Sequence, residues 1–149
     1  MKKTAVLLYP QFSEYELSVA LSVLMQGDKP VVTCWTKDEP VRGESGLTCL
    51  PDVIIQEIDL NDIDSILLPG CMDIMSLDEE EGLCTFLKAA GDKVSVIAAI
   101  SSSPYLLAKA GLLKGLRYTV GLTEEARDAS GLFEKGKTIQ IRWLSRTER

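Results

Sequence analysis

Apolar segments of about six residues alternate with amphipathic helical patterns along most of the chain. The strands that this pattern predicts are residues 4–9, 31–36, 64–69, 94–100, 117–120 and 138–143. The helices that it predicts are residues 13–26, 78–91, 104–111 and 123–128. Near-continuous apolar strands alternating with helices are typical of a parallel sheet that is covered on both faces. The pattern therefore predicts an α/β protein with a mostly parallel sheet.

Local signals mark where several of these elements begin and end. Ser13 and Glu16 have the spacing of a capping box, in which the glutamate carboxylate accepts a hydrogen bond from the N–H of Ser13. Gly43 and Gly46 predict the turns of a short hairpin that ends at residues 47–50. The expected N-cap residues of helices are Ser13, Ser103 and Thr123.

Length and charge exclude several classes of protein. A chain of 149 residues is long enough for one domain with a hydrophobic core, and we expect a single domain over residues 1–149. The net charge of −6 and the absence of a basic cluster disfavour nucleic acid or an anionic membrane as a partner. The apolar start of the chain is broken at Pro10, so we interpret it as a buried strand and not as a secretory signal. We expect a cytoplasmic protein that does not cross a membrane.

The cysteines are widely spaced and do not form a metal-binding pattern. Cys34, Cys49, Cys71 and Cys84 include no Cys-x-x-Cys pair, and the chain contains no histidine. Zinc sites in proteins usually combine closely spaced cysteines and histidines. We therefore expect reduced thiols, no metal site and no cofactor.

Ser101 follows the apolar strand of residues 94–100 and precedes a helix that begins near Pro104. A side chain at such a corner faces the free backbone N–H groups and the positive dipole end of the helix, which favours a reactive nucleophile. A serine nucleophile also needs a base, most often a histidine, and none is present. The sequence thus predicts the shape of a nucleophile site without its usual base.

Three motifs give the chain a resemblance to a known family. They are Tyr-Pro-x-Phe-x-x-x-Glu at residues 9–16, Asp-Ser-Ile-Leu-Leu-Pro-Gly at residues 64–70, and the strand, corner and helix of residues 97–115. Over roughly residues 3–125 the chain resembles the ThiJ/PfpI superfamily, which includes intracellular proteases or amidases and the parkinsonism-associated deglycase. The resemblance implies the flavodoxin-like, three-layer α/β/α sandwich that this group shares with class I glutamine amidotransferases.

The resemblance also implies roles for the residues at the corner. Relatives carry Cys-His-Gly, or a similar triplet, where this chain has Ser101, Ser102 and Ser103, so serine replaces the nucleophilic cysteine. In the family a glutamate of the first helix contacts the nucleophile, and Glu16 matches it. The backbone N–H groups of Ser102 and Cys71 match those that would hold an oxyanion, although the family usually has glycine in place of Cys71.

Each of these residues also has a purely structural interpretation. Ser103 before Pro104 is a favoured combination at a helix start, and Ser101 is a second candidate for helix capping. Glu16 serves either the capping box or the corner, because the two require different rotamers. Cys71 is a small residue after a turn, or the site to which the nucleophile has moved.

The end of the chain departs from the family. Relatives continue into a strand, a loop and a long covering helix, whereas this sequence ends at Arg149. A sheet without its covering helix exposes an apolar face, so we expect a homo-oligomer in which a second subunit covers it. A truncated or frame-shifted gene is the alternative explanation.

Two functions of different classes follow from these observations. The first is a degenerate site that binds a small molecule or partner without efficient turnover, because the cysteine nucleophile and the histidine are both missing. The second is a weak amidase or hydrolase with Ser101 as nucleophile, Glu16 as base, and the N–H groups of Ser102 and Cys71 as oxyanion donors. A structural or regulatory subunit is a third class. A deglycase or redox role ranks lower because its chemistry requires sulfur.

Overall fold

A parallel sheet forms the centre of the protein. The computed structural model describes residues 1–137 of the chain. The sheet has the strand order β5-β2-β1-β6-β7, and every neighbouring pair in it is parallel. Its strands are β1 (Lys3–Leu7), β2 (Val31–Trp35), β5 (Val53–Ile54), β6 (Ile63–Leu68) and β7 (Val96–Ala99). The α-helices are α1 (Glu14–Gln26), α2 (Glu81–Gly91), α3 (Pro104–Lys109) and α4 (Glu124–Ser130).

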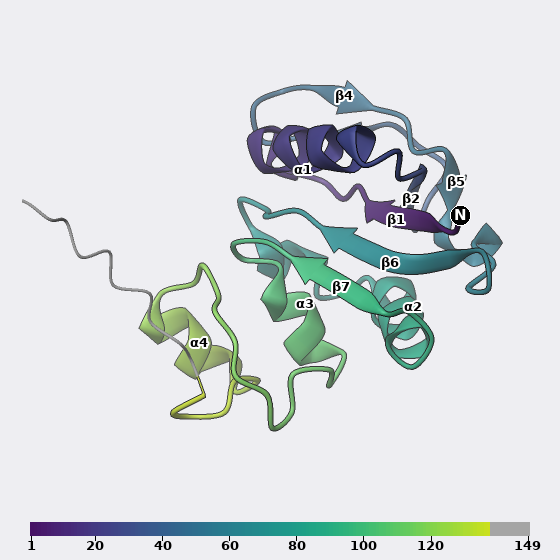
Figure 1. Ribbon diagram of the computed structural model, residues 1–149. Coiled ribbons are helices and arrows are strands. Elements are labelled where there is room, and N and C mark those ends of the chain that lie inside the picture. The colour runs from purple at the N-terminus through teal and green to yellow at the C-terminus, as the bar shows by residue number, and fades with distance from the viewer. Residues whose placement is uncertain (138–149) are drawn as a thin grey trace, which may run out of the picture.

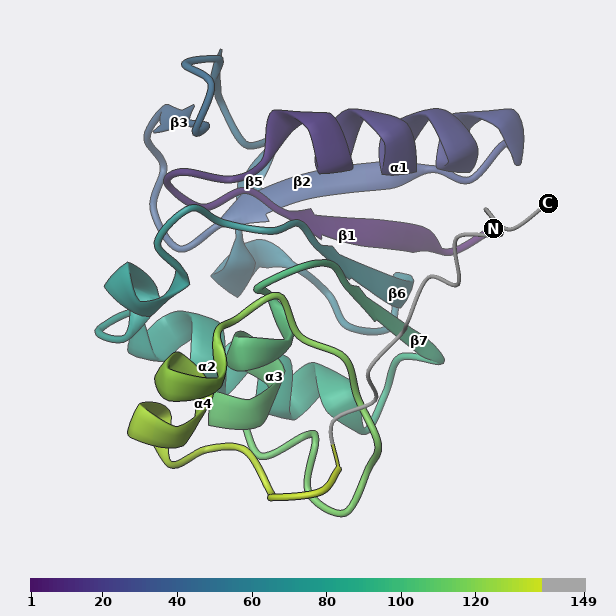
Figure 2. The same ribbon diagram turned by 90° about the vertical axis from the view of Figure 1, so that its left-hand side faces the viewer.

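Helices cover the two faces of the sheet. Figure 1 shows α1 on one face and α2 and α3 on the other, with α4 lying farther from the sheet than α3. This arrangement confirms the expected three-layer α/β/α architecture. The antiparallel hairpin of β3 (Val41–Arg42) and β4 (Thr48–Cys49) lies outside the main sheet, and Figure 2 shows β3 beside the N-terminal end of α1. The 3₁₀ helices η1 (Ile55–Glu57) and η2 (Ile74–Leu77) lie in connecting segments.

The core is centred on β1, because this strand pairs on both edges and is covered on both faces. Ala5, Val6 and Leu7 have no exposed surface. Beyond the strand, Tyr9 is also fully buried, and its ring packs edge-on against that of Trp35 with centroids 6.0 Å apart and an interplanar angle of 68°. Dense packing of this kind fixes the point from which the chain leaves the sheet.

The apolar pattern predicted most of the sheet, with two errors. Strands were correctly expected near β1, β2, β6 and β7, and the hairpin of β3 and β4 is confirmed. The two-residue strand β5 was missed because so short a segment has no detectable periodicity. No strand forms at residues 117–120, where one was expected: only Tyr118 is in a β-bridge, and its N–H donates to the carbonyl of Lys137 at 3.2 Å. The strand expected at residues 138–143 lies outside the described residues.

The three expected N-cap residues stand at the predicted positions, but only one of them caps its helix through its side chain. Thr123 caps α4 as predicted, accepting a hydrogen bond from the N–H of Ala126 at 3.1 Å. The hydroxyls of Ser13 and Ser103 make no capping hydrogen bond. Both of these serines are buried. The N–H of Ser13 donates to the carbonyl of Gly70 at 2.8 Å, and the hydroxyl of Ser103 lies near the carbonyls of Leu68 and Ile100.

Within residues 1–137, none of the helices is both long and apolar enough to cross a membrane.

Candidate active site at the carboxyl edge of the sheet

Three loops meet where β1, β6 and β7 end. The chain leaves β1 through Tyr9 and Phe12, leaves β6 through Gly70 and Cys71, and leaves β7 at Ser101. Because the strands are parallel, their carboxyl ends lie at the same edge of the sheet, which is where open α/β folds bind ligands. The structure thus brings the four residues singled out in the sequence, Ser101, Glu16, Cys71 and Ser102, to one region.

Ser101 has the backbone conformation of a sharp corner. Its φ is +58°, in the left-handed region that non-glycine residues seldom adopt, and the residue is exposed. Its carbonyl accepts a hydrogen bond from the N–H of Gly121 at 2.6 Å. A Cβ at Gly121 would lie 2.9 Å from the Ser101 Oγ, so the absence of a side chain there leaves room for the hydroxyl. Gly121 was not singled out from the sequence.

Glu16 points away from its own helix start. Its Oε2 accepts a hydrogen bond from the N–H of Gly70 at 2.7 Å. The N–H of Ser13, which a capping box would give to Glu16, donates instead to the carbonyl of Gly70 at 2.8 Å. The capping box is therefore wrong, because the loop after β6 supplies closer partners for both groups.

The carboxylate of Glu16 and the side chain of Ser101 lie on the same side of Gly70. A Cβ built on Gly70 would come within 2.3 Å of Glu16 Oε2 and 3.0 Å of Ser101 Cβ. Glycine at this position is what allows the two side chains to approach each other. Within residues 1–137, however, no hydrogen bond joins the Ser101 hydroxyl to Glu16 or to another side chain.

The hydroxyl of Ser102 is hydrogen-bonded to the backbone of Cys71. The N–H of Cys71 donates to Ser102 Oγ at 3.0 Å, and its carbonyl accepts from the same hydroxyl at 3.0 Å. Ser102 is buried, so water does not easily compete for these groups. One of the two N–H groups expected to hold an oxyanion is consequently used inside the protein. Among the hydrogen bonds of the described residues, none uses the N–H of Ser102 itself.

Ser103 stabilises the corner at Ser101 through contacts with two backbone carbonyls. Its buried hydroxyl lies 2.9 Å from the carbonyl of Leu68 and 2.8 Å from that of Ile100, at the ends of β6 and β7. Its single proton can serve one of these carbonyls at a time. The residue therefore ties two strand ends together and does not cap α3.

The environment of Cys71 disfavours a thiolate. Burial raises the pKa of the Cys71 thiol to about 11; nearby Asp73 and Glu44 act in the same direction, and a backbone hydrogen bond from Asp73 only partly offsets them. The sulfur donates to the carbonyl of Pro10 at 3.3 Å. Since the thiolate is the reactive form of cysteine, these contacts argue against transfer of the nucleophile to Cys71.

Tyr9 is a buried polar residue of the site that the sequence did not single out. Its hydroxyl donates to the carbonyl of Pro69, which links the end of β1 to the end of β6. Burial, together with nearby Cys71 and Glu16, raises the pKa of Tyr9 well above its ordinary range. The phenol thus remains a hydrogen-bond donor and holds the two strand ends in register.

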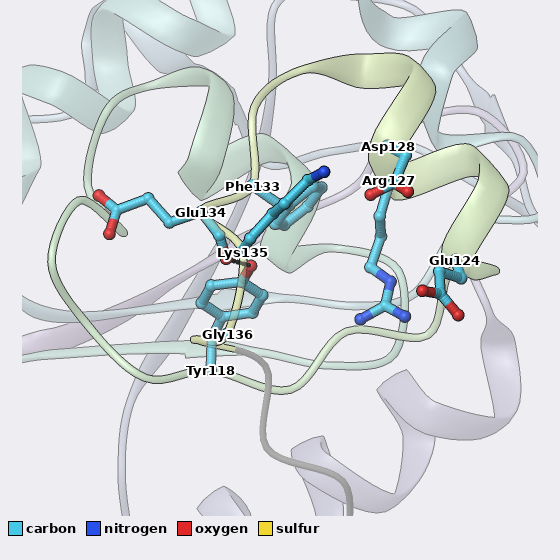
Figure 3. A pocket seen from close by; sticks show the side chains of 8 residues that line it. All are labelled: Tyr118, Glu124, Arg127, Asp128, Phe133, Glu134, Lys135 and Gly136. Atoms are coloured by element: carbon cyan, nitrogen blue, oxygen red, sulfur yellow. Dashed lines mark hydrogen bonds between the residues drawn. The ribbon is translucent and has the colours of Figure 1, made fainter.

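A separate pocket of about 310 Å³ lies between α4 and the segment that follows it (Figure 3). Its lining residues are Tyr118, Glu124, Arg127, Asp128, Phe133, Glu134, Lys135 and Gly136. None of the predicted site residues contributes to it. Within residues 1–137 there is also no cluster of three or more His, Cys, Asp or Glu side chains that could hold a metal ion.

Fold and site together define an α/β protein with a nucleophile-type corner at the carboxyl edge of a parallel sheet. The sequence pattern of the DJ-1/PfpI family matches residues 2–134, and the chain belongs to this family. This finding confirms the family resemblance of the corner and strand motifs.

Relatives and solved structures agree with this membership. Protein DJ-1alpha of Drosophila melanogaster is 30% identical over 79% of this chain and 56% of its own length. Deglycase TK1284 of Thermococcus kodakarensis is 27% identical over 81% of this chain and 73% of its own length. The crystal structure of a DJ-1 superfamily protein from Agrobacterium tumefaciens superimposes with a TM-score of 0.79, covering 95% of this chain and 75% of that one at 20% identity, and supports the fold. The chain thus spans little more than half the length of DJ-1alpha.

Proposed function

We propose that this DJ-1/PfpI protein uses the corner at Ser101 to bind a small molecule or a partner without efficient turnover. The proposal is supported mainly by the pairing of Ser102 with the backbone of Cys71, at 3.0 Å for each contact. An oxyanion would need the Cys71 N–H, and to obtain it the protein would have to break a buried hydrogen bond first.

The protonation chemistry of the corner supports the same proposal. A serine hydroxyl needs a base within hydrogen-bonding distance as it attacks. The Glu16 carboxylate is engaged by the N–H of Gly70 at 2.7 Å, and the sequence contains no histidine. Without an activated nucleophile, the remaining features of the site are an exposed hydroxyl and the N–H of Ser102, which suit the binding of a polar group.

Weak hydrolysis is the second candidate, and the conformation of Ser101 favours it. A φ of +58° is unfavourable for serine, and such strain is often found where a nucleophile must be presented. In this mechanism Glu16 would leave Gly70 and accept the proton of the Ser101 hydroxyl while the hydroxyl oxygen attacks a carbonyl carbon. The N–H of Ser102 would donate to the developing oxyanion.

Covalent labelling and turnover distinguish the two candidates. We expect no adduct on Ser101 after incubation with a fluorophosphonate probe, and the same slow hydrolysis of p-nitrophenyl acetate by the native protein and by Ser101→Ala. Rapid labelling of Ser101, together with hydrolysis that is lost in Ser101→Ala, would establish the hydrolase instead. For the binding function, an NMR screen of small polar metabolites should shift the amide signals of Gly70, Ser101 and Ser102 together.

We also propose that the protein self-associates through its uncovered apolar surface. Val96 and Ala98 of the edge strand β7 are exposed, while the alternate residues Ile97 and Ala99 are half-buried, so one face of this strand is open. On α1, Val19 and Val23 are 51% and 63% exposed. We expect the second subunit to cover these exposed apolar side chains.

Sedimentation equilibrium of the purified protein tests this proposal. We expect a mass of about twice that of the chain at micromolar concentration, and a return to the monomer in Val96→Lys or Val23→Lys. Ser18→Lys adds the same charge at an exposed polar position of α1. It is the control that shows whether dissociation depends on where the charge is placed. A native protein that remains monomeric at high concentration would refute self-association.

A further inference from the structure

A carboxylate outside the predicted site holds the hairpin that borders it. Glu14, in the first turn of α1, accepts hydrogen bonds from the N–H of Ser45 at 2.9 Å to each carboxylate oxygen and from the N–H of Leu47 at 3.1 Å. These donors belong to the hairpin loop, which we define as residues 43–47 between β3 and β4. Hydrogen bonds to a charged group are stronger than those between neutral groups. Glu14 therefore closes the hairpin loop around its own side chain.

Gly43 makes this closure possible. A Cβ at Gly43 would lie 2.3 Å from Glu14 Oε1 and 2.4 Å from its carboxyl carbon. The φ of Gly43 is not in the left-handed region, so the backbone alone would accept alanine. Glycine at position 43 thus leaves the space that the Glu14 carboxylate occupies.

The hairpin in turn holds the segment that leaves β1. Residues 10–12, here called the β1 exit segment, pair with the hairpin through Gln11 N–H to the Arg42 carbonyl at 2.8 Å and Glu44 N–H to the Phe12 carbonyl at 3.0 Å. Gln11 has a φ of +64°, which is unfavourable for a non-glycine residue. Such a conformation persists where neighbouring groups hold the residue in place, and the hairpin holds Gln11 on one side.

The β1 exit segment contacts the site directly on its other side. Phe12 forms an antiparallel bridge with Cys71, and the N–H of Met72 donates to the carbonyl of Gln11 at 3.1 Å. The thiol of Cys71 donates to the carbonyl of Pro10. Residues 70–72, the Cys71 loop, are therefore held by Ser102 on one side and by the β1 exit segment on the other.

We propose that Glu14 is a positioning residue of the site: by binding the hairpin loop it fixes the β1 exit segment and keeps the Cys71 loop closed. The proposal deepens the proposed function, because the Cys71 loop forms one wall of the site at Ser101. Removal of the carboxylate frees the hairpin loop, and the Cys71 loop then opens more often without unfolding of the sheet.

Thiol labelling measures this opening without any ligand or turnover. The native protein, Glu14→Ala, Glu14→Gln and Gly43→Ala are treated with iodoacetamide at a fixed alkaline pH, and the modified cysteine is identified by mass spectrometry. We expect Glu14→Ala to raise the labelling rate of Cys71 about tenfold, since labelling follows the population of the open loop. Glu14→Gln keeps a neutral acceptor and should give a smaller increase. Gly43→Ala, which displaces the carboxylate without removing it, should resemble Glu14→Ala.

Two internal references separate this local opening from loss of stability. Cys34 is fully buried in β2, so its labelling reports unfolding of the sheet. Its rate should rise only by the factor that the loss in global stability measured by urea unfolding accounts for, and by less than the rate of Cys71 in the same variant. Glu39→Gln, at an exposed position shortly before β3, removes the same charge and should leave the Cys71 rate at the native value.

Two results would overturn the role of Glu14. One is an unchanged Cys71 rate in both Glu14→Ala and Gly43→Ala. The other is a parallel increase of the Cys34 and Cys71 rates in these variants. Neither result would affect the binding function, which is judged from the amide shifts and from labelling of Ser101.

Discussion

The hydroxyl of Ser102 lies 3.0 Å from both the backbone nitrogen and the backbone oxygen of Cys71. This contact joins the helix-start side of the corner to the loop after β6, and it uses the N–H group on which an oxyanion would depend. Ser102 therefore helps to form the site and at the same time occupies the Cys71 N–H that was expected to hold an oxyanion. Four predictions follow from this arrangement and from the contacts around it.

Ser102→Ala is expected to destabilise the protein without creating an enzyme. The substitution leaves the buried N–H of Cys71 without its acceptor, which costs about 1–3 kcal/mol. Urea unfolding followed by circular dichroism measures the loss. Hydrolysis of p-nitrophenyl acetate should not increase, because the Ser101 hydroxyl still has no base. A marked increase in hydrolysis would show that the occupied donor was the main barrier to catalysis.

Ser101→Gly and Ser101→Ala should differ in stability because of the backbone at this position. Alanine keeps the unfavourable φ of +58°, whereas glycine adopts it readily at a smaller entropic cost. We expect the glycine variant to be more stable than the alanine variant by about 1 kcal/mol. Thermal unfolding of the pair is the measurement, and equal stability would indicate that the corner is not strained.

Gly70→Ala should displace Glu16. The new Cβ would lie 2.3 Å from Glu16 Oε2 and 3.0 Å from Ser101 Cβ, so the carboxylate must leave its hydrogen bond to Gly70. We expect a loss of about 1–3 kcal/mol in the free energy of unfolding. Gly27→Ala is the matched control, since a Cβ there would have ordinary contacts at 3.6 Å. Similar losses in the two variants would mean that Gly70 is not crowded.

Stability should decrease at acid pH partly because of Glu14. Although burial acts in the opposite direction, the backbone hydrogen bonds from Ser45 and Leu47 lower the pKa of Glu14 from its ordinary value of 4.5. A carboxyl whose pKa is lower in the folded state stabilises the fold above its unfolded pKa, and this contribution is lost as the pH falls through the folded pKa. Asp64, Asp78 and Glu80 contribute with the same sign. Although burial opposes the shift, most strongly at Asp78, these carboxylates accept hydrogen bonds from lysine side chains, which lower their pKa values too.

Urea unfolding of the native protein and of Glu14→Gln at a series of pH values below about 6 isolates the contribution of Glu14. The difference in stability between the two proteins should be largest near neutral pH and shrink on acidification through the window below 4.5. A difference that does not depend on pH would show that the charge of Glu14 plays no part.

The sequence by itself determined the order of the elements and the class of fold. Strands β1 and β6 end in continuous apolar runs, residues 5–7 and 66–68, because both faces of the sheet are buried there, and such runs can be recognised without the tertiary structure. The corner at Ser101 was recognisable from the apolar run that stops before Ser101 and from the Ser-Pro pair that favours a helix start, although β7 itself is open on one face. The absence of histidine was also evident from the composition alone.

Only the tertiary structure decided which partners the polar groups of the site use. Glu16 stood at the spacing of a capping box with Ser13, and Ser103 stood before a proline, so local rules favoured caps at both positions. In the fold, the loop after β6 gives Glu16 the N–H of Gly70, and the strand ends give Ser103 the carbonyls of Leu68 and Ile100. A hydrogen-bonding side chain chooses among all acceptors and donors within its reach. Which groups lie within reach of a buried side chain depends on residues distant in sequence, and these are placed by the packing of the sheet.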